Sequence, residues 1–202
     1  MQEVQVENTD NGLRARKRAD THARIHQAAL ALFARQGFEA TTLDDIATAA
    51  GVSRRSLFHY FGSKEDIVLS TKAGLTELIE AAIARRPADE PLLDMAEHAL
   101  TDMARDFQGP EARALARLIH DTPALRAGDH AKYEAIEQRM ATALAARKGL
   151  PANDLQARVV ATTAAGVLRM ATEAWLAADD DRGPEVHGKA AFMALRRAAS
   201  AT

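Results

Sequence analysis

A row of polar side chains between Ser53 and His59 could bind nucleic acid. Two adjacent arginines, Arg54 and Arg55, carry guanidinium groups that can donate two parallel hydrogen bonds to the O6 and N7 atoms of guanine. Hydroxyl and imidazole groups beside them can hydrogen-bond to bases or phosphates. We expect at least one arginine to reach a guanine edge and three neighbours to touch bases or phosphates: Ser53, Ser56 and His59. Adjacent arginines are also typical of a solvated helix face, so the elements that position them decide the interpretation.

Two short helices joined by a tight turn would position these arginines. Thr42 precedes an apolar stripe and Asp45 follows three residues later, which is the pattern of a capped helix start. Gly51 stands where that helix must end, because glycine adopts the left-handed conformation without steric cost. Ala47 is small enough for a close helix crossing, and Ser53 can cap the next helix. This spacing predicts a helix-turn-helix whose second helix enters a DNA major groove. The alternative is an ordinary helical hairpin with a basic face.

Phosphate contacts are expected on both sides of this motif. Thr41 or Thr42, Tyr60 and Lys64 are the candidates close to the two helices. The basic run 14–18 (RARKR) ends a polar, acidic N-terminus that we expect to be disordered. We predict that residues 1–17 form a flexible basic arm that follows phosphates or enters the minor groove, with Arg16 and Lys17 among its contacts. A solvated basic tail is the alternative.

The charge distribution supports a nucleic-acid surface in the first third of the chain only. The 202 residues carry a net charge of −2. Segment 14–64 nevertheless holds nine basic and four acidic residues, whereas segment 65–202 holds 17 basic and 21 acidic residues. The chain has no cysteine, which excludes disulfides and fits a reducing cytoplasm. Its polar N-terminus is unlike a signal peptide, and no apolar run approaches the ~18 residues of a membrane span.

Helical periodicity continues through the remaining residues, and no stretch alternates with a period of two. The sequence therefore predicts an all-α fold of about nine helices. A helix-turn-helix domain would cover residues 18–63, and a helical ligand-binding and dimerisation domain would cover 64–202. The strongest break in the pattern is the segment 84–91 (ARRPADEP). The expected helices are 18–36, 42–50, 53–61, 63–86, 92–107, 111–120, 129–147, 153–178 and 184–199.

The second domain contains candidates for a ligand pocket but no convincing catalytic set. There is no nucleophile elbow or phosphate-cradling glycine loop, so we expect neither an enzyme nor a cofactor. His22 and His26 have the spacing of two metal ligands, but no third ligand is suggested and we expect no metal. Methionine, phenylalanine and a few polar groups could line a pocket. The candidates are Met95, His98, Met103, Phe107, His120, Met140, Arg169, Met170 and Glu173. Each of them could instead be ordinary core or surface, and Arg169 could simply pair with Glu173.

The last two helices carry the best candidate surface for a dimer. Apolar and small side chains crowd one side of 153–178 and continue on 184–199, which suits a four-helix interface. The alternative is that this stripe belongs to the core of a single chain. The candidate interface residues are Ala164, Val167, Leu168, Ala171, Trp175, Phe192, Met193 and Leu195.

The stretch 41–68 (TTLDDIATAAGVSRRSLFHYFGSKEDIV) closely resembles the signature of the TetR/AcrR family of bacterial transcriptional repressors, and LFARQGFEATT before it is also similar. The resemblance is strong over about 18–70. One departure is Phe58, where the family often has tyrosine, so one phosphate contact through a hydroxyl is lost. The segments Pro123–Arg126 and Arg147–Pro151 resemble those of an actinobacterial, mycofactocin-type subgroup.

This resemblance implies a homodimer of nine- or ten-helix chains, a palindromic operator and a small-molecule inducer bound in the larger domain. The subgroup suggests an apolar or acyl-type inducer. The expected function is that of a ligand-responsive repressor released from its operator by the inducer. The alternative is a constitutive DNA-binding protein without an inducer.

Overall fold

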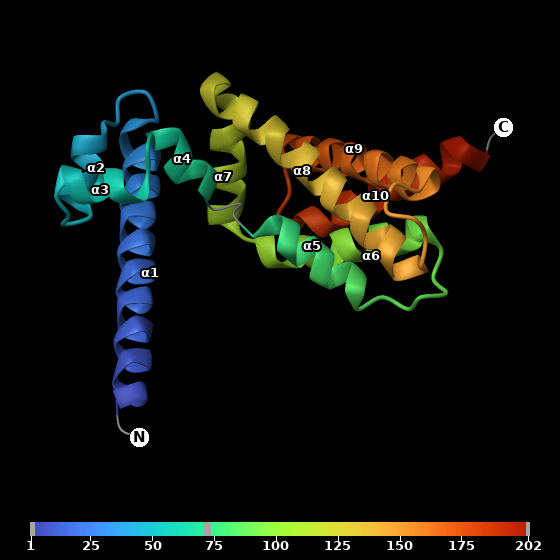
Figure 1. The fold of residues 1–202 in the computed structure, drawn as a ribbon. Coiled ribbons are helices and arrows are strands. Elements are labelled where there is room, and N and C mark those ends of the chain that lie inside the picture. The colour runs from blue at the N-terminus through green and yellow to red at the C-terminus, as the bar shows by residue number, and fades with distance from the viewer. Residues whose placement is uncertain (1–2, 71–73, 201–202) are drawn as a thin grey trace. The chain divides into compact units, whose positions relative to one another are not determined.

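The computed structural model describes residues 3–70 and 74–200, which form helices joined by short loops (Figure 1). This part of the chain contains ten α-helices, short 3-10 segments and no strand, which confirms the predicted all-α fold. One helix more than the predicted nine is present because a predicted helix is divided. The α-helices are α1 (Glu3–Gln36), α2 (Leu43–Ala49), α3 (Arg54–Tyr60), α4 (Lys64–Leu69), α5 (Leu75–Ala84), α6 (Leu92–Ala104), α7 (Pro110–Asp121), α8 (Pro123–Lys148), α9 (Leu155–Ala177) and α10 (Pro184–Ser200), and the 3-10 helix η2 spans Arg105–Phe107.

The chain divides into two compact units, residues 1–71 and 72–202. The first unit contains α1 to α4, and the second contains α5 to α10. This division lies beyond the boundary expected after residue 63, so α4 packs with the helix-turn-helix. The segment 84–91 lies inside the second unit, where Ala84 ends α5 and residues 85–91 form a loop. Within the described residues, no helix combines the length and the apolar character needed to cross a membrane.

Helix α1 begins at Glu3, well before the predicted start at Arg18. The described part of the expected arm, residues 3–17, therefore continues the helix. No proline interrupts this segment. Extending an existing helix costs little per residue compared with starting a new one, so even a polar segment can prolong it. Arg16 and Lys17 are exposed on this helix.

The predicted helix 63–86 is divided into α4 and α5, so its continuity was predicted wrongly. Helix α4 ends at Leu69, and α5 begins after Gly74, whose φ is 93°. Glycine takes this left-handed conformation readily and is a poor residue for a helix interior. The apolar periodicity runs on through the division because both pieces bury one face.

Helices α5, α6, α8, α9 and α10 build the core of the second unit, in which α8 packs on α5 and α9, and α9 also packs on α10. Alanine allows close helix approach throughout this core, and its larger residues include Ile79, Ile83, Met95, Ile136, Met140, Leu144 and Phe192. Both α7 and α8 start with proline at the first helical position, where its fixed φ and missing N–H are tolerated. The start of the helix expected at 129–147 was therefore predicted wrongly, because residues 123–128 form the first turns of α8.

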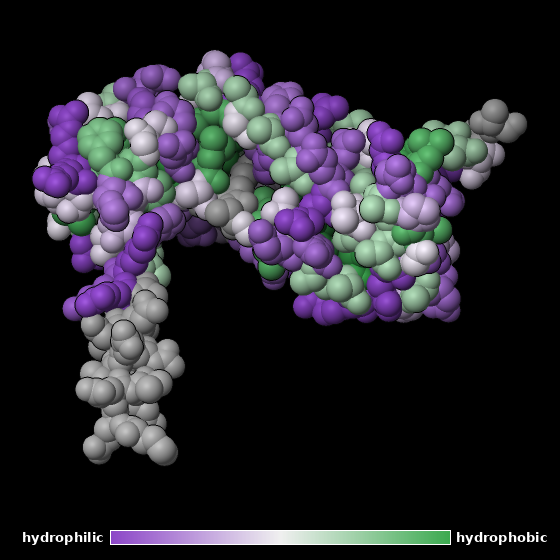
Figure 2. All heavy atoms as spheres, viewed as in Figure 1, coloured by the Kyte–Doolittle hydropathy of each residue, from purple (hydrophilic) through white to green (hydrophobic). Residues whose placement is uncertain are grey.

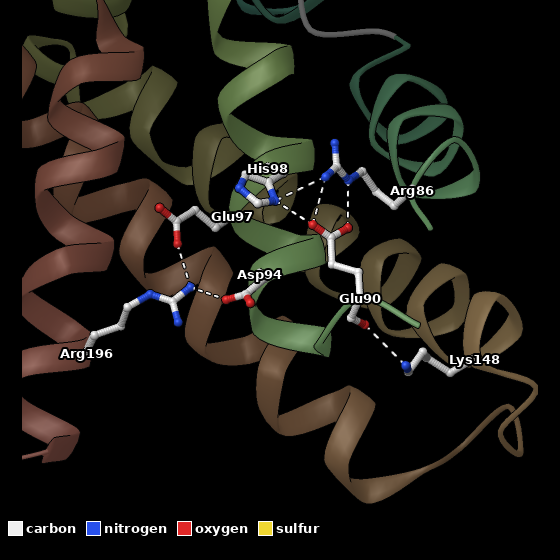
Figure 3. A network of polar contacts seen from close by, with 7 residues as sticks. All are labelled: Arg86, Glu90, Asp94, Glu97, His98, Lys148 and Arg196. Atoms are coloured by element: carbon white, nitrogen blue, oxygen red, sulfur yellow. Dashed lines mark hydrogen bonds and ion pairs between the residues drawn. The ribbon is translucent and has the colours of Figure 1, made fainter. Parts of the chain in front are cut away.

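Polar side chains fix the loop between α5 and α6 (Figure 3). The Arg86 guanidinium donates to both carboxylate oxygens of Glu90 at 2.7 Å, and His98 Nδ1 lies 2.6 Å from Glu90 Oε1. Lys148 at the end of α8 donates to the Glu90 carbonyl at 3.2 Å. Hydrogen bonds from Arg86 lower the pKa of Glu90 to about 2, against the cost of its burial. Nearby, Arg196 of α10 pairs with two carboxylates of α6, those of Asp94 and Glu97.

Candidate nucleic-acid interface

The turn between α2 and α3 has the geometry expected from its sequence. Thr42 Oγ1 accepts a hydrogen bond from the Asp45 N–H at 3.1 Å, and the Asp45 carboxylate accepts one from the Thr42 N–H at 2.9 Å. The Thr42 hydroxyl and the Thr42 N–H both donate to the Asp45 carboxylate, and these two hydrogen bonds lower the pKa of Asp45. Gly51 has a φ of 63°, and the Val52 N–H donates to the Ala47 carbonyl at 3.0 Å. The cap, the small residue and the glycine thus close the turn as predicted.

Helix α1 supports this turn from behind. Its inward stripe is buried and consists of Ile25, Ala29, Leu32 and Phe33. Phe38 folds back on this stripe, with its ring 5.0 Å from that of Phe33. Arg24 donates to the Ala50 carbonyl at 3.2 Å and so caps the end of α2. His22 packs against Phe61 with ring centroids 4.6 Å apart, and burial lowers the pKa of His26.

Helix α3 buries one face and exposes the other. Ser53 accepts a hydrogen bond from the Ser56 N–H at 3.1 Å and caps the helix. Leu57 is fully buried and anchors the helix to the unit. The exposed face contains Arg54, Arg55, Ser56, Phe58 and His59. This seven-residue helix thus presents the predicted polar row to solvent.

The two arginines of α3 differ in their surroundings. Arg54 Nη1 lies 2.8 Å from Asp44 Oδ2, and its guanidinium lies 5.6 Å from the centre of the Phe58 ring. Arg55 forms no hydrogen bond or ion pair with any described residue. Phe58 is 46% exposed, and hydrophobic side chains interrupt the hydrophilic surface over α2 and α3 in Figure 2. The sequence analysis did not predict Asp44 as a partner of Arg54. Its position in the first turn of α2, close to the start of α3 across the tight turn, could have indicated this pair.

Two of the predicted phosphate contacts, Thr41 and Lys64, form hydrogen bonds within the first unit. Thr41 is 1% exposed, and its hydroxyl donates to the Gly37 carbonyl at 2.7 Å. Lys64 Nζ donates to the Phe38 carbonyl at 2.8 Å and lies 4.4 Å from the centre of the Phe38 ring. Both side chains hold the α1–α2 turn in this structure, so the expected role for them is not supported.

The remaining flanking candidates are better placed. Thr42 is exposed, but its hydroxyl donates to Asp45 Oδ2 at 2.7 Å. Tyr60 is half-buried, with the Arg18 guanidinium 5.9 Å from its ring centre. Arg16 and Lys17 extend the basic surface along α1.

The predicted ligand residues do not form a single site. Met95 and Met140 are fully buried and Met103 is 7% exposed, so they are core residues, and Phe107 packs against the same core. Met170 is 52% exposed on the surface, and His98 is held by Glu90. Three candidates do come together in a cleft of about 160 Å³ between α7, α8 and α9: His120, Arg169 and Glu173. Arg169 and Glu173 form an exposed pair at 3.2 Å, as the plainer interpretation proposed.

Most of the predicted dimer residues are core residues of the single chain. Five of the eight are buried by their own helices: Ala164, Val167, Ala171, Trp175 and Phe192. For these residues the alternative of an intramolecular stripe is correct. Leu168 and Leu195 are partly buried against the core, and Met193 is 54% exposed. The large apolar residues that α9 exposes are Leu155, Val159 and Met170.

An N-terminal helix-turn-helix unit followed by a helical unit defines a class of bacterial transcriptional regulators. Residues 25–71 match the family described as bacterial regulatory proteins, tetR family, and residues 90–197 match the MftR C-terminal domain. The chain belongs to the TetR family of transcriptional regulators, with an MftR-type C-terminal domain. This confirms both the predicted family and the subgroup.

Two curated relatives align with most of the chain. The HTH-type transcriptional regulator TcmR of Streptomyces glaucescens is 36% identical over 180 residues, which cover 84% of this chain and 80% of TcmR. The putative mycofactocin biosynthesis transcriptional regulator MftR of Mycobacterium tuberculosis is 33% identical over 168 residues, covering 80% of this chain and 82% of MftR. These relatives are named as transcriptional regulators, and neither matching family is one of enzymes.

Solved structures share the fold at low sequence identity. SmeT in a complex with triclosan gives a TM-score of 0.65 at 18% identity, covering 89% of this chain and 91% of SmeT. The TetR-family repressor FadR of Thermus thermophilus, in a complex with lauroyl-CoA, gives 0.56 at 24% identity, covering 85% of this chain and 91% of FadR.

Proposed function

We propose that this protein is a transcriptional repressor that binds a palindromic operator as a homodimer and is released by a small ligand. The observation that carries the proposal is α3, a capped helix anchored by buried Leu57 that exposes Arg54, Arg55 and His59 together. A helix of this kind, supported by a second helix across a glycine turn, suits insertion into a major groove.

Arg55 is the proposed reader of a guanine edge, because it is exposed and makes no competing bond with a described residue. Arg54 would join it after leaving Asp44, since an exposed ion pair contributes only ~0–1 kcal/mol. Ser53, Ser56 and His59 would contact bases or phosphates beside them. Phe58 offers an apolar surface suited to the methyl group of thymine.

Phosphate contacts are proposed for Arg16 and Lys17 on α1 and for Thr42 and Tyr60 beside α3. These residues contribute sequence-independent affinity and fix the register of α3 on the duplex. Thr42 also begins α2, whose backbone N–H groups add partial positive charge at that end.

The proposed dimer surface is the exposed apolar side of α9 and α10. Leu155, Val159 and Met170 lie on α9, and Met193 lies on α10, each more than half exposed. An open groove of about 490 Å³ continues this surface and is lined by residues of α6, α9 and α10: Leu93, Val159, Val160, Thr163, Leu195, Arg196, Ala199 and Ser200. Apolar side chains in such numbers on a soluble surface favour an interface. Two chains related by a two-fold axis would match a palindrome.

The ligand would act by shifting a population. It would bind more tightly to a conformation in which the two α3 helices no longer fit successive major grooves. FadR and SmeT bind lauroyl-CoA and triclosan in their structures, which supports a small organic ligand here. The buried Met95 and Met140 favour a closed core and therefore the alternative of a DNA-binding protein without an inducer.

The test is to select binding sites from random duplexes and to measure affinity by fluorescence anisotropy at several salt concentrations. We expect a palindromic consensus, one dimer or more per site, and affinity that falls steeply with salt. Adding an apolar or acyl-type ligand should weaken binding. Salt-dependent, saturable binding without any ligand response supports the alternative, and no saturable binding to any selected duplex rejects the proposal.

A further inference from the structure

An open cleft of about 660 Å³ lies in the second unit, where the beginning of α7 meets the end of α9. The loop 178–183, which joins α9 to α10, forms its other wall. A volume of this size is in the range of small-molecule sites. Pro110, Arg113, Ala114, Arg117 and Trp175 line the cleft from the two helices, and Asp179 and Asp181 line it from the loop.

Two arginines of α7 face this cleft without a carboxylate partner. Arg113 donates from Nη2 to the Trp175 carbonyl at 2.6 Å and also bonds to the carbonyls of Ala178 and Asp180. Arg117 Nη2 donates to the Leu176 carbonyl at 2.8 Å. All of these acceptors are neutral backbone groups, and among the described residues neither arginine forms an ion pair. The end of α9 carries only about half a negative charge, so most of the positive charge on the two arginines remains uncompensated.

The carboxylates of the cleft do not cancel these charges. Asp180 is held by Arg182 through bonds of 2.6 and 2.8 Å, and Arg182 lowers the pKa of Asp180 to about 2. Asp179 and Asp181 line the cleft, but neither lies within ion-pair distance of Arg113 or Arg117 in the structure. An incoming anion would therefore meet guanidinium groups that have spare hydrogen-bond capacity.

One buried donor in this cleft has no acceptor. Arg113 Nε is buried and forms no hydrogen bond, although its guanidinium lies 5.7 Å from the ring centre of Trp175. Buried N–H groups without partners are uncommon in folded proteins, and a bound water or ion is one explanation for them. The start of α7 adds partial positive charge to the cleft, because Gly109 provides no side-chain cap and leaves the first N–H groups of the helix without a capping acceptor.

We propose that this cleft binds a small organic anion. Its carboxylate or phosphate head would lie against Arg113 and Arg117, and its apolar body would pack on Pro110, Ala114 and Trp175. Guanidinium groups bind both kinds of head group through parallel hydrogen bonds. Binding does not depend on the proposed function, but the role of this anion as the effector rests on it.

The position of the cleft gives a route from the ligand to the dimer surface. Arg113 and Arg117 hold the last carbonyls of α9 and the loop that leads into α10. An anion bound through the spare N–H groups of Arg117 would place negative charge beside the Leu176 carbonyl, at the negative end of the α9 dipole. It would thereby loosen the end of α9, one of the two helices assigned to the dimer surface.

Calorimetric titration of the full chain with decanoate, decyl phosphate and decanol tests the proposal. At least one of the two anions should bind with one site per chain and at least tenfold more tightly than decanol. Tenfold corresponds to 1.4 kcal/mol, at the lower end for hydrogen bonds to a charged group. The chain has one tryptophan, Trp175, so binding should also change its fluorescence. Equal affinity for decanol and for both anions, or no binding at all, overturns the proposal.

The variant Arg117→Gln should weaken anion binding about tenfold and leave decanol unchanged. Arg85→Gln makes the same charge change at an exposed position outside the cleft and should bind like the wild type. Equal anion binding by Arg117→Gln and the wild type overturns the proposal. Should Arg117→Gln fail to fold by circular dichroism, Arg117→Lys and the comparison of anion with alcohol on the wild type decide the question.

Operator affinity measured with and without the bound anion separates the two proposals. DNA binding without anion binding rejects the cleft but leaves the DNA-binding function. Anion binding by a chain that binds no DNA supports the cleft and rejects the repressor.

Discussion

The substitution Asp44→Asn should tighten operator binding by freeing Arg54. In the free protein the Asp44 carboxylate holds Arg54 Nη1 at 2.8 Å, and both side chains are about 60% exposed. Arg54 must leave this partner to reach a base edge or phosphate. Asparagine keeps the shape of the side chain and removes the charge that competes with DNA.

The expected gain follows from the exposure of the pair. Exposed ion pairs contribute ~0–1 kcal/mol, which corresponds to at most about a fivefold change in affinity. Removing a negative charge near the phosphates adds a second gain, which does not depend on Arg54 and shrinks at high salt. We therefore expect an increase of about two- to fivefold, part of which persists at high salt.

A double-mutant cycle separates these two effects. Operator affinity is measured by fluorescence anisotropy for the wild type, Asp44→Asn, Arg54→Ala and the double variant, at low and high salt. The salt-resistant part of the gain should disappear in the Arg54→Ala background. An equal gain in both backgrounds refutes the competition between Asp44 and DNA for Arg54.

Four further predictions concern DNA reading, stability and assembly. Arg55→Ala should cost ~1–3 kcal/mol of operator binding and relax the preference at one base position, which selection on random duplexes would reveal. Lys64→Met should leave the salt dependence of operator binding unchanged. This substitution removes the hydrogen bond to the Phe38 carbonyl, so it should lower the free energy of unfolding, measured in urea, by ~1–2 kcal/mol. The pKa of Glu90 in the folded protein is about 2, below the ordinary 4.5. The ionised Glu90 carboxylate therefore stabilises the fold above pH 4.5, and this stabilisation is lost as the pH falls towards 2. Glu90→Gln should make the free energy of unfolding less dependent on pH over that window in acid titrations. Val159→Glu should shift a dimer to monomers in sedimentation experiments, and an unchanged dimer would place the interface elsewhere.

The helix-turn-helix could be predicted because its determinants are local. The Thr42 cap, the glycine turn at Gly51 and the Ser53 cap each act within four residues along the chain, so the sequence alone contains the whole signal. The partners of the flanking residues are less local. Lys64 bonds to a carbonyl that lies 26 positions earlier, and nothing in the local pattern distinguishes that role from a phosphate contact.

Helix limits were less predictable where no local signal opposed continuation. Residues 3–17 of α1 have no apolar stripe, which suggested disorder, yet a polar segment can extend a helix that is already formed. At Gly74 the helix was predicted too long rather than too short. The continuous apolar periodicity suggested one helix, but a glycine in the left-handed conformation separates α4 from α5. Periodicity reports which face is buried and does not report whether the backbone is continuous.

An apolar stripe also does not identify what covers it. Helix α9 is apolar on more than one side, and the crowded stripe with Ala164 and Trp175 faces its own chain, while Leu155 and Val159 remain outside. For the same reason the cleft between α7 and α9 could not be predicted from the sequence.

Arg113 and Arg117 are four residues apart on an amphipathic helix, a pattern that is typical of a solvated helix face. Only the tertiary structure brings the carbonyl end of α9 against them and leaves their charge without a carboxylate, which turns an ordinary helix surface into a candidate anion site.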